Sequence, residues 1–122
     1  MESIHADAAP PKAGPYSHAI RTGNLVFLAG QGPFDPATGT IPDTAEDQAR
    51  QTFRNLAAVA EAAGTSLANA VRVGVYLRTM DDFAAMNRVY TEFFTEPYPV
   101  RTTIQSDMSI PVEADAVLEL PS

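Results

Sequence analysis

The sequence of 122 residues contains no cysteine. This absence excludes a disulfide framework, a thiolate nucleophile and any metal held by cysteine. Histidine is nearly absent as well, since His5 and His18 are the only two, and the carboxylates are scattered through expected loops and helices. Because transition-metal sites draw on clustered histidine, cysteine and carboxylate ligands, we expect no metal site.

Positive charge is also scarce. The chain carries 8 Lys and Arg against 15 Asp and Glu, for a net charge of −7. The cations stand singly along the chain, at Lys12, Arg21, Arg50, Arg54, Arg72, Arg78, Arg88 and Arg101. Nucleic-acid binding rewards clustered cations, so we expect no nucleic-acid partner. An anionic substrate would need a local cation to offset the acidic field, which draws attention to each arginine near a cleft.

Long hydrophobic runs are missing too. No stretch approaches the ~20 apolar residues of a membrane span, and the start "MESIHADAAPPKAGPY" has neither a basic nor an apolar segment of signal length. We therefore expect a cytoplasmic protein without membrane contact. The length is near that of one typical domain, and we expect a single domain over residues 1–122.

Proline and alternating patterns predict the elements. Residues 1–15 are expected to form an extended lead-in, because their prolines prevent a helix. Period-two patterns and turn residues predict strands, at 16–21, 24–29, 70–78, 100–106 and 112–118. Helical spacing predicts one helix that begins at Asp43 or Thr44 and ends at Gly64, and a second that begins at Asp81 or Asp82 and stops before Pro97.

The resulting order β-β-α-β-α-β-β predicts an α+β fold, with a mainly antiparallel or mixed sheet and two helices on one face. Two helices are enough to cover one face of such a sheet. The strand at 24–29 is apolar on both sides, so both its faces look buried. We therefore expect the second face to pack against another subunit in a homo-oligomer.

The stretch "YPVRTTIQSD" contains one arginine, whose charged guanidinium stands in a predicted strand where the surrounding residues are typical of a buried sheet. Strand alternation puts Arg101 and Thr103 on one face of this strand, and Glu113 and Asp115 on one face of the last strand. If the two strands are neighbours, the guanidinium of Arg101 and a carboxylate of the last strand face the same space. Two interpretations stay open: Arg101 binds a substrate carboxylate, or it forms an internal ion pair with Glu113 or Asp115.

Other residues have simpler explanations. His18 is either a proton shuttle or a polar strand residue. Tyr90, Phe93 and Phe94 lie at helical spacing, which favours core positions over pocket positions.

Five collinear segments resemble one known family. They are "AGPYSHA", "GNLVFLAGQGPFDPATGTIP", "QARQTFRNLAAVAEAAG", "VGVYLRTMDDFAAMNRVYTEFF", and "YPVRTTIQ" with "VEADAV". In order and content they are similar to the YjgF/Rid family of reactive intermediate deaminases. The resemblance implies a chorismate-mutase-like fold, assembled as a homotrimer with clefts between subunits.

The resemblance also implies an activity. Family members hydrolyse enamine and imine intermediates, such as 2-aminoacrylate and 2-iminobutanoate, to 2-keto acids and ammonia. This is the activity of a 2-iminobutanoate/2-iminopropanoate deaminase, and it uses neither an organic cofactor nor a metal. The implied partners are therefore a small 2-imino or 2-enamino acid and further copies of the chain.

Carried over by motif, the resemblance assigns two catalytic residues. Arg101 stands in the "P-x-R" motif and would bind the substrate carboxylate. Glu113 matches the first acidic residue of the family's last strand, read here as "VEADA", and would polarise the attacking water. The turn before this strand departs from the family pattern, so Glu119 is the alternative to Glu113.

Four further residues match positions that line the cleft in the family. They are Tyr16 of the "GPY" motif, Ala29, Asn87 of the second helix and Thr103. Many members have serine where Ala29 stands and cysteine where Thr103 stands, and these departures bear on the identity of the substrate more than on the fold.

Two other functions remain open. One is a deaminase of another acidic substrate in aromatic or pyrimidine breakdown. The other is a non-enzymatic role, as a sensor that binds 2-keto acids or as a holdase.

Overall fold

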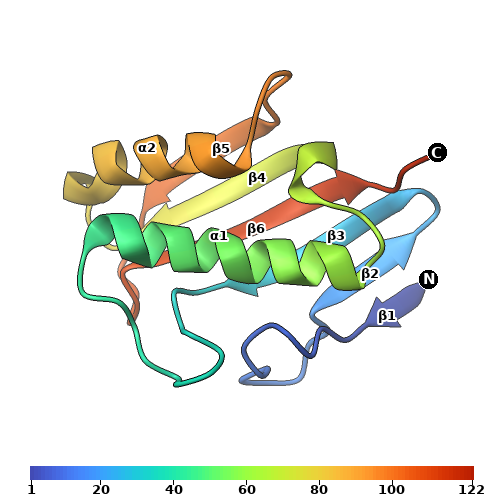
Figure 1. Cartoon of the computed structure of the whole chain (residues 1–122), viewed down its shortest axis with the longest axis horizontal. Coiled ribbons are helices and arrows are strands. Elements are labelled where there is room, and N and C mark those ends of the chain that lie inside the picture. Colours follow the sequence, from blue (N-terminus) through green and yellow to red (C-terminus); the bar gives the residue numbers. More distant parts are fainter.

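One six-stranded sheet with both helices on the same face makes up the protein (Figure 1). The computed structural model describes all residues from 1 to 122. The strands are β1 (Glu2–Ile4), β2 (Ala19–Thr22), β3 (Leu25–Gln31), β4 (Ala70–Leu77), β5 (Val100–Gln105) and β6 (Val112–Glu119). Their order in the sheet is β1-β2-β3-β6-β4-β5, and every pair is antiparallel except β4 with β5. The predicted α+β fold is confirmed, with one strand more than expected.

The additional strand is β1, which lies in the segment predicted to be an extended lead-in. It pairs with β2, and β2 begins at Ala19 rather than at Tyr16. His18, only 1% exposed, holds the segment in place: its Nδ1 accepts a hydrogen bond from the backbone N of Ala6 at 2.9 Å, and its Nε2 lies 3.0 Å from the carbonyl oxygen of Pro10. Because both ring nitrogens are engaged by the backbone, His18 has a structural position, and the proton-shuttle interpretation loses its support.

The helices begin and end close to where the sequence predicts. α1 (Ala45–Ala62) is capped by Thr44, whose Oγ1 accepts from the backbone N of Asp47 at 3.1 Å. Gly64, with φ of +87°, reverses the chain just after this helix. α2 (Phe83–Phe93) follows a 3₁₀ turn, and the Asp82 side chain makes no cap hydrogen bond. Asp82 occupies the N-cap position, so the predicted start of this helix is confirmed, but its capping hydrogen bond is missing because the short turn already starts the chain on a helical course.

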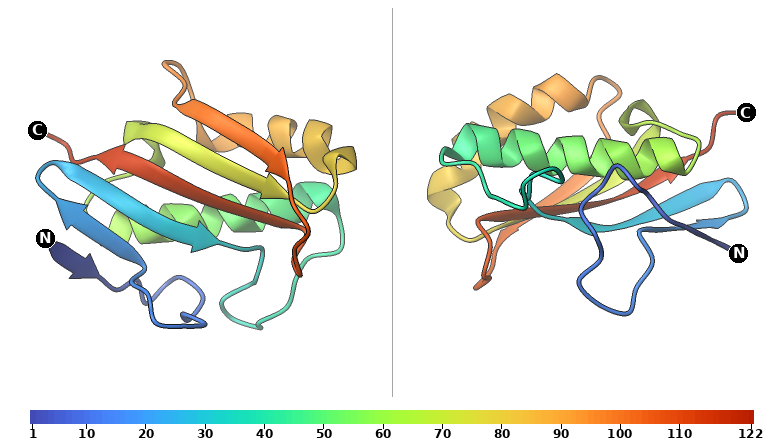
Figure 2. Two further views of the ribbon diagram at one scale, coloured as in Figure 1. Left: turned by 180° about the vertical axis from the view of Figure 1, so that it is seen from behind. Right: turned by 60° about the horizontal axis from the view of Figure 1, so that its bottom comes forward.

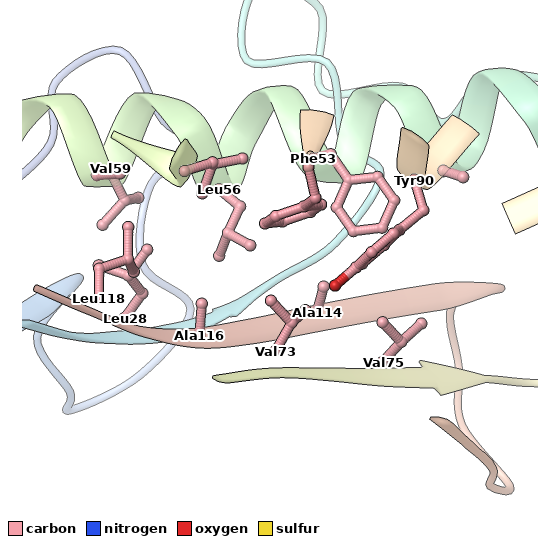
Figure 3. Packing of buried hydrophobic residues seen from close by; sticks show 14 of the residues in the cluster. Leu28, Phe53, Leu56, Val59, Val73, Val75, Tyr90, Ala114, Ala116 and Leu118 are labelled. Atoms are coloured by element: carbon pink, nitrogen blue, oxygen red, sulfur yellow. The ribbon is translucent and has the colours of Figure 1, made fainter. Parts of the chain in front are cut away.

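The hydrophobic core lies between the helices and one face of the sheet (Figure 3). Phe53, Leu56 and Val59 of α1 and Tyr90 of α2 point at the strands. The strands meet them with Leu28, Val73, Val75, Ala114, Ala116 and Leu118. The small alanines of β6 leave room for the large rings above them, so the helices settle closely on the sheet.

The opposite face of the sheet carries no helix (Figure 2). On β3, Val26 and Leu28 are 0% and 5% exposed on the helix side, whereas Phe27 is 45% exposed on the open side. In the single chain, therefore, one face of this strand is buried, and the face predicted to pack against another subunit is open. Val100 and Ile104 of β5 are also exposed on this face. Neither helix is long and apolar enough to cross a lipid bilayer.

Candidate active site

A cavity of about 420 Å³ opens between α2 and the start of β5. Six residues line it, and we call it the arginine pocket: Asn87, Tyr90, Thr91, Tyr98, Pro99 and Arg101. The parallel pairing of β5 with β4 places Arg101 opposite Val73, on the helix side of the sheet. The pocket is therefore built from the edge strand and the helix that crosses it.

Arg101 has no carboxylate partner. It takes part in none of the protein's ion pairs. Its guanidinium carbon lies 4.6 Å from the centre of the Tyr90 ring, and its Nη1 lies 4.0 Å from the Met86 sulfur. The interpretation as an internal ion pair is therefore wrong, and this half-buried cation is left free to pair with an anion from outside.

Glu113 lies on the other face of the sheet. It sits opposite Tyr76 of β4, on the open side, and β4 separates its strand from that of Arg101. The condition under which Arg101 and Glu113 would face the same space, neighbouring strands, is therefore not met within one chain. Because β6 lies inside the sheet and β5 at its edge, a single chain does not bring the guanidinium and the carboxylate into one space.

The Glu113 carboxyl rests against the backbone of β3. A Cβ at Gly30 would lie 2.9 Å from the Glu113 Cδ and Oε1, so any larger residue there would make the carboxyl move. Burial raises the pKa of Glu113 above its ordinary value, and the negative charge of Asp115 raises it further. A carboxyl with a raised pKa is suited to give and take protons near neutral pH.

A second acidic side chain stands beside it. The Tyr76 hydroxyl donates a hydrogen bond to Asp115 at 2.9 Å, and Arg72 Nη1 lies 3.5 Å from the other carboxylate oxygen. Asp115 thus has two polar partners, whereas Glu113 accepts no hydrogen bond from the protein. The two neighbouring carboxyls of β6 therefore have different environments.

The other predicted site residues lie in different places: two lie near Arg101, one lies beside Gly30, and one lies before β2. Asn87 lines the arginine pocket with Arg101, and Thr103 follows on the same face of β5, with its Oγ1 buried and without a hydrogen-bond partner. Ala29 precedes Gly30, where the register of β3 against β6 shifts. Tyr16 is 46% exposed, and its hydroxyl accepts from the backbone N of Ala13 at 3.2 Å.

Tyr16 belongs to the segment between β1 and β2, which packs against the core through Ala6 and Ala9. Glu119, the alternative to Glu113, is exposed at the end of β6, where it pairs with Leu25. Glu119 is thus far along β6 from Glu113, the residue that contacts Gly30.

Sequence reasoning missed four residues of the arginine pocket, Tyr90, Thr91, Tyr98 and Pro99, of which the two tyrosines are the largest. Tyr90 was expected in the core; it is 5% exposed and does belong to the core, but it also lines the pocket beneath Arg101. The signal was its position three residues after Asn87, on the same side of the helix. Tyr98, 50% exposed in the proline-rich turn, has no periodic pattern that would have placed it at the pocket.

A small α+β protein with a pocket suited to an anion is what this fold and site define. The Endoribonuclease L-PSP family model matches residues 6–118. A RutC family protein of Pyrococcus horikoshii is 46% identical over 124 residues, which cover 97% of this chain and 98% of that protein. The protein named "Putative reactive intermediate deaminase TdcF" in Escherichia coli is 38% identical over 122 residues, covering 93% of this chain and 95% of the relative.

Solved structures agree. The crystal structure of E. coli TdcF with bound serine superposes with a TM-score of 0.92 at 32% identity, covering 99% of this chain and 100% of that one. RidA from an Antarctic Psychrobacter species superposes with a TM-score of 0.93 at 37% identity, covering 98% of this chain and 100% of that one. The chain therefore belongs to the Endoribonuclease L-PSP family, also called the YjgF/RutC family.

Proposed function

We propose that this protein is a cofactor-independent deaminase that hydrolyses 2-imino and 2-enamino acids, such as 2-iminobutanoate and 2-aminoacrylate, to 2-keto acids and ammonia. The observation that carries the proposal is the unpaired guanidinium of Arg101 at the wall of a cavity of about 420 Å³. Two parallel hydrogen bonds from a guanidinium match a carboxylate. The serine bound to TdcF is an α-amino acid, and its carboxylate is the group that Arg101 would bind.

The site needs a second copy of the chain. Arg101 and Glu113 lie on opposite faces of the sheet, so the catalytic pair forms only if the pocket of one subunit meets the open face of another. Phe27, Val100 and Ile104 give that open face exposed apolar side chains, which a subunit contact would cover. We therefore propose a homotrimer with clefts between subunits.

The chemistry requires positioning and proton transfer. An enamine first takes a proton on its β-carbon and becomes an iminium. Water then adds to the iminium carbon, and Glu113 as carboxylate accepts the proton that the water loses. Glu113 then returns that proton to the amine nitrogen of the resulting carbinolamine. The C–N bond breaks as the carbinolamine hydroxyl loses its proton to Glu113 and becomes the keto group, and ammonia takes up this proton and leaves as ammonium. Arg101 holds the carboxylate throughout, and Asn87 and Thr103 orient the substrate beside it.

The test is ammonia and keto-acid release from 2-aminoacrylate and 2-iminobutanoate, generated in situ by a threonine or serine dehydratase. Wild type should accelerate release, and Arg101→Ala should lose roughly 30-fold or more, since removing a charge partner costs ~2 to 5 kcal/mol at ~1.4 kcal/mol per tenfold. Arg54→Ala, an exposed arginine on α1, is the matched control and should keep full activity.

Two results would contradict the proposal. Full activity in folded Arg101→Ala would show that Arg101 is not needed to bind the substrate carboxylate. A monomeric mass of the active wild type in light scattering would show that the site is not shared between subunits. Tight keto-acid binding by wild type without turnover would instead indicate the sensor role. RNA as a substrate is disfavoured by the net charge of −7.

A further inference from the structure

The Arg101 guanidinium has no counter-ion and packs instead against three side chains, those of Phe83, Met86 and Tyr90, which we call the cradle. The guanidinium carbon lies 4.6 Å from the centre of the Tyr90 ring and 5.9 Å from that of Phe83, and Nη1 lies 4.0 Å from the Met86 sulfur. All three supporting residues belong to α2, which crosses over the strand that carries Arg101. An aromatic face attracts a cation without neutralising it, so the guanidinium keeps both its charge and its free donors.

The Tyr90 ring is itself fixed in place. It stacks on Phe94 with ring centres 4.3 Å apart, and it meets Phe53 edge to face at 5.7 Å. Tyr90 is 5% exposed, and Figure 3 shows its ring reaching from α2 toward the sheet. Its hydroxyl is buried without a hydrogen-bond partner. The side chain is thus anchored by its ring alone, and no hydrogen bond explains why a tyrosine stands there.

We propose that Tyr90 is a positioning residue, whose ring face fixes the Arg101 guanidinium in the orientation that binds the substrate carboxylate. This inference rests on the proposed function for the identity of the anion. It adds a role for a residue that touches Arg101 and lines the pocket. Burial raises the pKa of the Tyr90 phenol, which keeps the ring neutral and leaves the charge on Arg101 uncompensated.

Two substitutions of Tyr90 separate the contribution of its ring from that of its hydroxyl. Tyr90→Phe keeps the ring face and removes only the unpartnered hydroxyl, so KM and kcat should stay within about twofold of wild type. Tyr90→Leu removes the ring face. It should raise KM, and the Kd for 2-oxobutanoate as a product-like carboxylate, by about tenfold while kcat changes much less, because a cation–π contact of a desolvated cation is lost.

Phe93→Leu is the matched control. It exchanges an aromatic ring for leucine on the same helix, and Phe93 contacts Phe53 but not Arg101. This variant should lose stability as Tyr90→Leu does and yet bind 2-oxobutanoate like wild type. An equal loss of binding in both variants would overturn the proposal, because the effect would then come from general loosening of the core.

A readout without ligand separates this inference from the proposed function. The NMR signal of the Arg101 Nε–H should report an ordered side chain in wild type and Tyr90→Phe, and a mobile one in Tyr90→Leu. If wild type neither turns over imines nor binds 2-oxobutanoate, the proposed function fails while the order of Arg101 still tests the cradle. An unchanged Arg101 signal in Tyr90→Leu, or a Tyr90→Phe variant as impaired as Tyr90→Leu, would overturn the cradle itself.

Discussion

At the scale of single residues, Glu113 combines a proposed catalytic role with a cost to the fold. Its carboxyl lies against Gly30 and near Asp115, without a hydrogen bond from the protein. The same burial and neighbouring charge that suit it to proton transfer disfavour its ionised form. Stability and proposed activity therefore make opposite demands on this side chain.

This conflict predicts a pH-dependent gain of stability in Glu113→Gln. Because the pKa of Glu113 is higher in the folded state than the ordinary value of 4.5, ionisation weakens folding as the pH rises above that value. Glu113→Gln should therefore have the larger free energy of unfolding at neutral pH, and the difference should disappear below about pH 4. Urea unfolding at both pH values measures it.

Asp115→Asn is the companion variant. It removes the charge that raises the pKa of Glu113, so it should shrink the pH dependence that Glu113→Gln abolishes. A wild type whose advantage over Glu113→Gln grows with rising pH would show that the pKa of Glu113 is lowered, contrary to this account.

The sequence was informative about individual residues where a pattern or motif carries the information. Strand alternation correctly grouped Arg101 with Thr103 on one face of β5, and Glu113 with Asp115 on one face of β6, but it did not indicate that these are opposite faces of the sheet. It gave no information on which residue touches which, so neither the contact between Arg101 and Tyr90 nor that between Glu113 and Gly30 was foreseen.

At the scale of the elements, Asn55 joins α1 to the loop that follows β3. Its Nδ2 donates to the carbonyl oxygens of Gly32 at 2.9 Å and Phe34 at 2.8 Å, and its Oδ1 accepts from Gln51 at 2.9 Å. Asn55 is 2% exposed, so no bulk water replaces these bonds if they are lost.

Asn55→Ala should therefore reduce the free energy of unfolding by about 2 kcal/mol or more, since each buried acceptor left unpaired costs ~1 to 3 kcal/mol. Gln51→Ala is the control: its amide touches only Asn55, and its loss should cost less than ~1 kcal/mol. Thermal or urea unfolding compares the two. Equal losses would show that the loop carbonyls find other partners in the variant.

The elements were predictable to the extent that each is local. Caps, helical spacing and period-two alternation located both helices and five strands. β1 was missed because its three residues have no distinguishing pattern and depend on His18 contacts twelve residues apart in the sequence. The insertion of β6 between β3 and β4 was beyond reach, since strand order depends on packing across the whole chain.

At the scale of the whole molecule, the two halves of the proposed site are separable. Arg101→Ala and Glu113→Gln should each be inactive alone, because each removes one half of every cleft. If the halves come from different subunits, unfolding the two variants together and refolding the mixture should restore part of the activity, since some clefts then receive an intact Arg101 and an intact Glu113.

The controls are each variant refolded alone and a mixture of the two without unfolding. Mixtures that stay inactive, although mass measurements show hybrid assemblies, would place both residues in the cleft of one subunit and contradict the shared site.

The placement of Arg101 and Glu113 on opposite faces also bears on symmetry. A two-fold dimer uses one patch on each subunit, and a single patch does not readily include both faces of a sheet. Head-to-tail contacts join one face to the other, and they generate either rings or open filaments. An open filament of subunits leaves Arg101 without a partner carboxyl at one end and Glu113 without a partner arginine at the other. In a closed ring every Arg101 meets a Glu113. Closure would thus be favoured by the chemistry as well as by the packing.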